Sequence, residues 1–209
     1  TVEVQPGMVL DHLNAFLKPH GLWYPVDVST SAQATLGGMA GNNSCGSRSI
    51  AYGNMVHNVL GIDAILADGS QEYFGPFGVG AARPMGSART ARLVSALFEL
   101  GARERDEIER VWPRVMRRVG GYNLDVFHPR SERPYTADGS VNLSHLLVGS
   151  EGTLAYFRRL HLKLSPLPVH KVLGVVNFQS FHQAMDSARH LVTLGPSAVE
   201  LVDRTIARG

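Results

Sequence analysis

The chain has 209 residues, of which 44% are apolar and 18% charged, and its formal net charge is +2. These values are typical of a globular protein with one large domain, or a domain and a half, and they point to no strongly acidic or basic partner. No apolar run approaches the ~20 residues that a membrane-spanning helix needs, and the first residues do not resemble a secretory signal. The arginine pairs are too isolated for a nucleic-acid surface.

Cys45 is the single cysteine. A single cysteine excludes an internal disulfide framework and a cysteine-rich metal or iron–sulfur site within these residues. It also fits a cytoplasmic setting. The chain opens on a strand-like TVEVQPG and stops just after an apolar segment. We therefore expect a piece of a longer protein.

Periodicity predicts the elements of the first part of the chain. A helix is expected where apolar residues recur at helical spacing, and a strand where they alternate with polar ones. The predicted order is a strand over 1–5, a helix over 8–17, an extended segment over 22–24, a strand over 56–66, a turn at Asp68-Gly69 and a returning strand over 71–74.

The remainder mixes helices and strands without steady alternation, which favours an α+β fold over a doubly wound sheet. We expect a surface loop over 75–86, helices over 88–101 and 104–118, a turn-rich region over 120–142 and a strand over 156–164. Pro113 is unfavourable inside the second helix. A strand over 172–178, a helix over 181–194 and an extended segment over 198–202 then predict the start of a βαβ-type unit.

The stretch TLGGMAGNNSCG, residues 35–46, has four glycines and two adjacent asparagines. Glycine lets another molecule approach the main chain, and successive free N–H groups can form an anion site. We expect a bare loop here. The pattern fits a phosphate or diphosphate cradle as well as it fits a tight turn that binds nothing.

Together with its neighbours, this stretch resembles a known family. The order Thr35, Gly37-Gly38, Asn43 with Gly46, Tyr52-Gly53 and Asp68-Gly69 is similar to the second half of the FAD-binding domain of the vanillyl-alcohol oxidase / p-cresol methylhydroxylase (PCMH) flavoprotein superfamily. Downstream, GGYNLD (120–125) and LLVGSEGTLAYFRRLHLKLSPLP (146–168) resemble elements of its D-lactate, glycolate and D-2-hydroxyglutarate dehydrogenase branch. The resemblance covers about residues 1–168.

This resemblance implies the domain organisation. Residues 1–168 would be the second subdomain of a PCMH-type FAD-binding domain, an antiparallel or mixed sheet flanked by helices, with a helical insertion at about 75–119. Residues 169–209 would begin the substrate, or cap, domain. The first FAD subdomain, most of the cap and any iron–sulfur domain would lie outside these residues, so a separate 209-residue piece is expected to show no turnover.

The resemblance also implies a cofactor site. The first loop would contact the FAD diphosphate and ribityl chain, largely through main-chain N–H groups, and the GSEGT loop would pass near the flavin. The residues implied are Thr35, Gly37, Gly38, Gly41, Asn42, Asn43, Ser44, Gly46, Tyr52, Gly53, Gly149, Ser150, Glu151, Gly152 and Thr153. Ser49 could add a hydroxyl. A structural role stays open for Tyr52 in the core, and for Glu151 as a cap or backbone ligand.

The catalytic base is not identified, because the family implies that it comes from the cap. Arg117 and Arg118 stand just before GGYNLD, where the family places a basic residue for the substrate carboxylate. A guanidinium suits a carboxylate through its planar fork, and a solvated pair at a helix end is the alternative. Cys45 is expected to be an ordinary packed thiol, not a flavin attachment site. We predict no metal site among the scattered histidines.

The implied function is dehydrogenation of a D-2-hydroxy acid by hydride transfer to flavin N5, within an FAD-dependent oxidoreductase. The substrate would be of the D-lactate, glycolate or D-2-hydroxyglutarate type. A quinone, cytochrome or other carrier would take the electrons, and peripheral attachment to the inner membrane stays open. Two alternatives remain: an oxygen-using FAD oxidase of sugar-like alcohols or lactones, and a non-redox nucleotide-binding or structural module.

Overall fold

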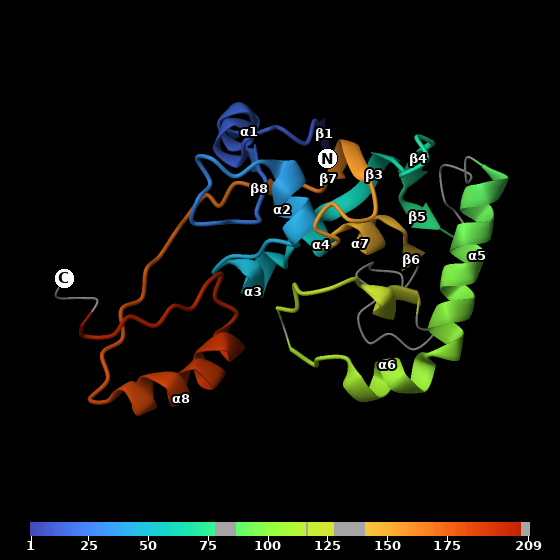
Figure 1. The fold of residues 1–209 in the computed structure, drawn as a ribbon. Helices are drawn as coiled ribbons and strands as arrows, with labels where there is room; N and C mark the ends of the chain where they lie inside the picture. The colour runs from blue at the N-terminus through green and yellow to red at the C-terminus, as the bar shows by residue number, and fades with distance from the viewer. Residues whose placement is uncertain (78–86, 116, 128–140, 206–209) are drawn as a thin grey trace.

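A four-stranded antiparallel sheet forms the centre of the computed structural model, which describes residues 1–77, 87–115, 117–127 and 141–205 (Figure 1). Its strands are β1 (Val2–Val4), β7 (Tyr156–Leu162), β3 (Val59–Ile65) and β4 (Gln71–Phe74), in the order β1-β7-β3-β4. The first and the last of the sheet's strands in sequence, β1 and β7, pair directly, with Val2 opposite Leu162. The predicted α+β class is confirmed.

Helices contribute to the same hydrophobic core as the sheet. In α1 (Leu10–Leu17), three leucines at helical spacing, Leu10, Leu13 and Leu17, are buried. They join one cluster with residues of β3, β7, α2 (Leu36–Asn42), α4 (Met55–Asn58) and α7 (Ser144–Leu147). An amphipathic helix on a half-buried sheet stabilises both elements, because each removes the other's apolar face from water.

Shorter elements surround this core. Two-stranded ribbons join β2 (Leu22–Trp23) to β8 (Ser165–Pro166) and β5 (Pro76–Phe77) to β6 (Val141–Asn142). The remaining helices are α3 (Ser49–Tyr52), α5 (Ala88–Arg103), α6 (Arg105–Val111) and α8 (Phe181–Leu191). Three short 3-10 turns complete the list: η1 (Lys18–His20), η2 (Leu124–Phe127) and η3 (Val192–Leu194).

The strongest periodic patterns gave correct predictions. The helices expected over 8–17, 88–101 and 181–194 correspond to α1, α5 and α8 with η3, and the strand over 156–164 corresponds to β7. The Asp68-Gly69 turn is confirmed: Gly69 has a φ of +84°, and Oδ1 of Asp68 accepts a hydrogen bond from the Ser70 amide at 3.1 Å.

Other predictions were wrong at positions where a local contact overrides the pattern. The helix expected over 104–118 ends at Val111, since Pro113 cannot continue it. The strand expected over 56–66 begins only at Val59, because residues 55–58 form α4 and the Asn54 amide donates to Nδ1 of His57 at 2.9 Å. Parts of the expected loop over 75–86 and of the turn-rich region over 120–142 lie outside the described residues.

Residues 169–205 contribute nothing to the buried core. The predicted strand over 172–178 has no strand partner there, and Val172 and Leu173 are almost fully exposed. The extended segment expected over 198–202 is likewise unpaired. Helix α8 has no buried residue and lies apart from the sheet (Figure 1). A strand pattern alone is insufficient, because the backbone groups need a neighbour to pair with.

Candidate functional site

The glycine-rich stretch is a helix, so the prediction of a bare loop over 35–46 was wrong for most of its length. Helix α2 begins after Thr35, whose Oγ1 accepts a hydrogen bond from the Gly38 amide at 3.4 Å. Leu36, Met39 and Ala40 are buried. Their i, i+3, i+4 spacing is that of one helix face, and this signal was present in the sequence beneath the glycines.

Most main-chain N–H groups of this stretch already donate within the chain. At the start of α2, the amide of Leu36 donates to the carbonyl of Met8 at 2.8 Å, and that of Gly37 donates to the carbonyl of Pro6 at 2.8 Å. At its end, the Ser44 amide donates to the carbonyl of Met39 at 2.9 Å. The expected row of free amides is therefore absent at these positions, and ligand contacts would come from side chains and from the glycine surface.

Two of the predicted site glycines are explained by the chain itself. A Cβ on Gly37 would lie 2.5 Å from Cβ of Pro6, and one on Gly46 would lie 2.3 Å from the carbonyl oxygen of Asp27. Gly38 and Gly41 differ, since the nearest atoms to an added Cβ are 3.3 Å and 3.9 Å away. Gly38 is exposed, so another molecule can approach it, whereas Gly41 is buried and has Glu151 and Gly152 of the GSEGT loop as its nearest neighbours.

The GSEGT loop lies directly against α2, so the two predicted motifs meet although they are about 110 residues apart in sequence. The amide of Gly149 donates to the carbonyl of Ala40 at 2.9 Å, and the amide of Glu151 donates to the carbonyl of Gly41 at 2.9 Å. The loop thereby satisfies carbonyl groups that the end of a helix would leave unpaired. The side chain of Asn42 adds a third link, from Nδ2 to Oε1 of Glu151, at 2.9 Å.

Backbone conformation is unusual in this loop. Gly149 and Gly152 have φ values of +87° and +71°, and Glu151 has a φ of +52° although it carries a side chain. A left-handed conformation at a non-glycine residue costs free energy and is enriched at functional sites. Ser150 is 1% exposed, and its hydroxyl has no hydrogen-bond partner in the part of the chain that the structure describes.

Asn43 connects these two segments with a third. It is 1% exposed, and its Oδ1 accepts a hydrogen bond from the amide of Val56 at 3.0 Å. Its Nδ2 donates to the main-chain carbonyl of Arg118 at 3.3 Å. Asn43 thus has a structural role at the junction, with its side chain turned into the protein.

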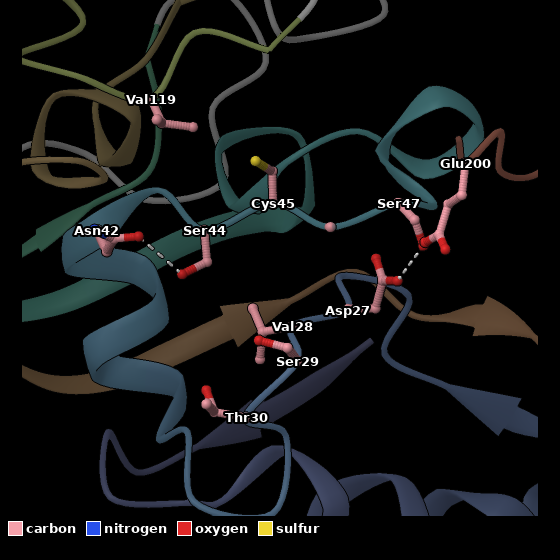
Figure 2. Close-up of a pocket in the computed structure, with 11 residues that line it drawn as sticks. Asp27, Val28, Ser29, Thr30, Asn42, Ser44, Cys45, Ser47, Val119 and Glu200 are labelled. Carbon is pink, nitrogen blue, oxygen red and sulfur yellow. Dashed lines mark hydrogen bonds between the residues drawn. The ribbon is translucent and has the colours of Figure 1, made fainter. Parts of the chain in front are cut away.

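A pocket of about 600 Å³ opens beside this junction. Figure 2 shows Asn42 and Ser44 on one side of it and Asp27, Ser47 and Glu200 on the other. Oδ2 of Asp27 accepts a hydrogen bond from the hydroxyl of Ser47 at 3.1 Å. Hydroxyl, amide and carboxylate groups suit a ligand rich in hydroxyls.

Sequence reasoning missed several of the residues that line this pocket. They are Asp27, Val28, Ser29, Thr30, Ser47, Val119 and Glu200. Asp27–Thr30 directly precede the recognised motif, and this polar run could have been noticed. Glu200 stands about 150 residues further along the chain, and no local pattern indicates that it returns to the pocket.

Other predicted site residues lie outside the pocket lining. Tyr52 packs edge-on against Trp23, with ring centroids 5.3 Å apart. Gly53 has a φ of +76°, and an added Cβ would lie 2.7 Å from the ring of His57. Both therefore have local structural roles. Thr153 shares a 2.8 Å hydrogen bond between its hydroxyl and that of Tyr122 in the GGYNLD motif.

The two arginine candidates have different surroundings. Nη2 of Arg118 lies 2.8 Å from Oδ1 of Asp125, and the two side chains are only 6% and 8% exposed. Arg117 is exposed, and its Nη1 donates to the carbonyl of Gly46 at 3.1 Å, at the edge of the pocket. Of the two guanidinium groups, that of Arg117 is exposed and that of Arg118 is buried in an ion pair.

Comparisons with known proteins identify relatives of this chain. A family model described as an FAD binding domain matches residues 1–75. Two D-2-hydroxyglutarate dehydrogenases, from Pseudomonas putida and Escherichia coli, are 34% and 32% identical to the chain, and each alignment covers 98% of it. A probable mitochondrial D-lactate dehydrogenase from Danio rerio is 28% identical over 93% of the chain.

The chain is homologous to D-2-hydroxyglutarate and D-lactate dehydrogenases, and its residues 1–75 match an FAD-binding domain. It spans about a fifth of the length of the D-2-hydroxyglutarate dehydrogenases that it matches, and 28% of the Danio rerio protein. The family relationship therefore concerns this segment, which contains both motifs of the junction.

The residues present fit the family's cofactor. The FAD-binding family match extends over α2 and the pocket residues Asp27 to Ser47. The junction offers the exposed surface of Gly38, the exposed side chain of Asn42 and the hydroxyl of Ser150, which has no partner among the described residues. A buried hydroxyl without a partner favours a ligand at this place, because burying it unsatisfied is costly.

Two kinds of feature are absent from the described residues. No group of three or more histidine, cysteine or acidic side chains within the described ranges is arranged to hold a metal ion. Over those same ranges, no helix combines the length and the apolar character needed to cross a bilayer.

His145 lies close behind the junction in α7. It is 3% exposed, and burial, with a further contribution from His57, lowers its pKa from the usual 6.5 to about 3. The imidazole is therefore neutral near pH 7. The nearby carbonyl oxygen of His145 accepts a hydrogen bond from Nδ2 of Asn123, at 2.8 Å.

Proposed function

We propose that this chain is the part of an FAD-dependent dehydrogenase in which α2 and the GSEGT loop hold the flavin cofactor, and that the whole protein oxidises a D-2-hydroxy acid. The observation that carries the proposal is the junction: three hydrogen bonds, each of 2.9 Å, join residues 40–42 to residues 149–151 beside a polar pocket. Similarity to D-2-hydroxyglutarate dehydrogenases along 98% of the chain supports it.

The bound FAD would supply the hydride acceptor for the alcohol carbon of the substrate. The chain's own contribution is binding and orientation. Asn42 and Ser44 would hydrogen-bond hydroxyl or phosphate oxygens of the cofactor, and the exposed Gly38 would let it approach the helix. Ser150 would complete its own hydrogen bonding against the bound group.

Arg117 is the residue proposed to meet the substrate carboxylate. Its guanidinium is exposed at the pocket edge, whereas that of Arg118 is already paired with Asp125. A guanidinium holds a carboxylate in a fixed orientation through two parallel hydrogen bonds. Such a contact contributes binding free energy in the ground state and the transition state alike.

The domain boundary near residue 168 is proposed from the same family relationship. Residues 1–168 would belong to the FAD-binding domain, and residues 169–209 would begin the substrate domain. The exposed valines of residues 169–176 and the unburied helix α8 support this division, since these apolar side chains lack a core of their own in the described residues.

The decisive experiment is anaerobic reduction of the flavin in the complete polypeptide. The visible absorbance of the purified protein is recorded, and D-2-hydroxyglutarate, D-lactate and glycolate are then added separately without oxygen. Loss of the absorbance with one of them is the expected result and names the substrate. A yellow protein that none of them bleaches would contradict the dehydrogenase, and a colourless protein that takes up no FAD would contradict the cofactor site.

A further inference from the structure

Arg118 carries a buried ion pair whose presence the proposed function leaves unexplained. Its guanidinium is 2.8 Å from Asp125, and its Cζ lies 4.7 Å from the ring centroid of Trp112. Burying two charges removes their hydration, so such a pair contributes little to stability compared with an apolar pair of the same volume. Buried ion pairs can instead fix one particular backbone conformation, and this is the role considered for Arg118 and Asp125.

The main chain of Arg118 is fixed as well as its side chain. Its carbonyl accepts the hydrogen bond from Nδ2 of Asn43, and Asn43 is itself bonded to the amide of Val56. On the other side, Gly149 lies close to this segment: an added Cβ would be 3.3 Å from the carbonyl of Gly121 and 3.7 Å from that of Val119. Residues 117–121 are thus held between the end of α2 and the GSEGT loop.

The neighbours of Arg118 face the pocket. Arg117 donates to the carbonyl of Gly46, which is a lining residue, and Val119 is part of the lining itself. Val119 is 37% exposed, and Arg117 is also exposed, so neither side chain is fixed by burial. Their positions depend on the backbone between them, and that backbone is fixed at Arg118.

We propose that Arg118 and Asp125 are positioning residues: their ion pair holds residues 117–121 so that Arg117 and Val119 stay at the pocket wall. The inference rests on the proposed function, because it assumes that the pocket binds a ligand that Arg117 orients. It assigns the two adjacent arginines to separate tasks, with Arg117 in contact with the ligand and Arg118 in support of Arg117.

The test uses the complete polypeptide with Asp125→Asn, which removes the charge at nearly constant volume, and Arg118→Lys, which keeps the charge and loses the planar fork. Leu13→Ala is the matched control for stability, since Leu13 is 1% exposed in α1. Glu107→Gln is the control for an ion pair at the surface, since Oε1 of Glu107 lies 2.6 Å from Nη2 of Arg110.

Hydrogen exchange provides a readout that does not require activity. In Asp125→Asn and Arg118→Lys, the amides of residues 117–121 are expected to exchange about tenfold faster, whereas exchange in α1 stays unchanged. Leu13→Ala, which is expected to lower the melting temperature by a similar amount, should speed exchange in α1 and leave exchange of residues 117–121 unchanged. Equal exchange of residues 117–121 in Asp125→Asn and Leu13→Ala would overturn the inference.

Kinetics provide the second readout. Asp125→Asn is expected to raise KM for the 2-hydroxy acid about tenfold with kcat nearly unchanged, because Arg117 binds the substrate carboxylate in the ground state and the transition state alike. A KM no higher than that of Leu13→Ala would count against positioning. A wild-type protein that holds no flavin would refute the proposed function, while hydrogen exchange would still decide the role of the ion pair.

Discussion

The side-chain amide of Asn42 donates to Oε1 of Glu151 at 2.9 Å, which links the end of α2 to the GSEGT loop across 109 positions of sequence. Both side chains are exposed, so the link can be cut without opening the core.

Replacing Asn42 by alanine is expected to lower the free energy of unfolding by less than about 1 kcal/mol, because a solvent-exposed hydrogen bond exchanges readily with water. The FAD dissociation constant should rise several-fold, since the loop that holds Ser150 loses a constraint. Fluorescence titration with FAD measures this. Gln71→Ala, which removes an exposed side-chain contact between the edge strand β4 and Arg158 of β7, is the control and should leave FAD affinity unchanged.

The glycines of residues 35–46 should separate into two classes. Gly38→Ala should change stability little, because the preference of about 1 kcal/mol for alanine over glycine in a helix is offset by a contact of 3.3 Å with Oγ1 of Thr35, which must shift slightly. Gly46→Ala should destabilise the protein, since its Cβ would overlap the carbonyl of Asp27. Thermal unfolding distinguishes the two.

Larger side chains at Gly38 and Gly41 test the cofactor site directly. Gly38→Val is expected to leave the protein folded and to abolish flavin retention, because the added methyl groups occupy the exposed space proposed for FAD. Gly41→Val should also lose the flavin, but by pushing on Glu151 and Gly152 of the GSEGT loop. Visible absorbance after gel filtration measures retention. A folded Gly38→Val protein that keeps its flavin would contradict the placement of FAD at α2.

Stability should depend on pH through His145. Its pKa is about 3 in the folded protein and near 6.5 when unfolded, so the unfolded chain binds the extra proton between these values. The contribution of His145 to stability is therefore complete above pH 6.5 and is lost as the pH falls towards 3, by about 1.4 kcal/mol per unit. Urea unfolding at several pH values measures the slope, and His145→Gln should flatten it. An identical slope in the two proteins would exclude His145 as its cause.

Removing residues 169–209 should leave the melting temperature of residues 1–168 within a few degrees of the parent chain, because none of the described residues from 169 to 205 is buried. Differential scanning calorimetry of the two chains measures it. A large decrease in the melting temperature of the shortened chain would contradict a domain boundary near residue 168.

Much of the fold follows from local sequence, and the parts that do not follow depend on long-range contacts. The leucines of α1 and the alternation of β7 carry their own signal. At α2, the number of glycines obscured the buried face formed by Leu36, Met39 and Ala40. Residues 172–178 have the composition of a strand. A strand also requires a neighbouring strand to pair with, and composition does not indicate whether such a partner is present.

The same limit applies to the candidate site. The two motifs were found from their order in the sequence, whereas their contact through Glu151 is a product of the tertiary fold. The choice between Arg117 and Arg118 depended on Asp125, which lies only seven residues from Arg118 but forms its ion pair in the interior.

The pairing of β1 with β7 has a consequence for synthesis. Val2 leaves the ribosome about 160 residues before its partner Leu162, and at 5–20 residues per second this delay is roughly ten to thirty seconds. Because β7 lies between β1 and β3, the sheet cannot close during that interval, and the apolar side of β1 and β3 stays uncovered. The nascent chain is thus expected to need a chaperone at this stage, and the cofactor can be loaded only after the GSEGT loop has emerged.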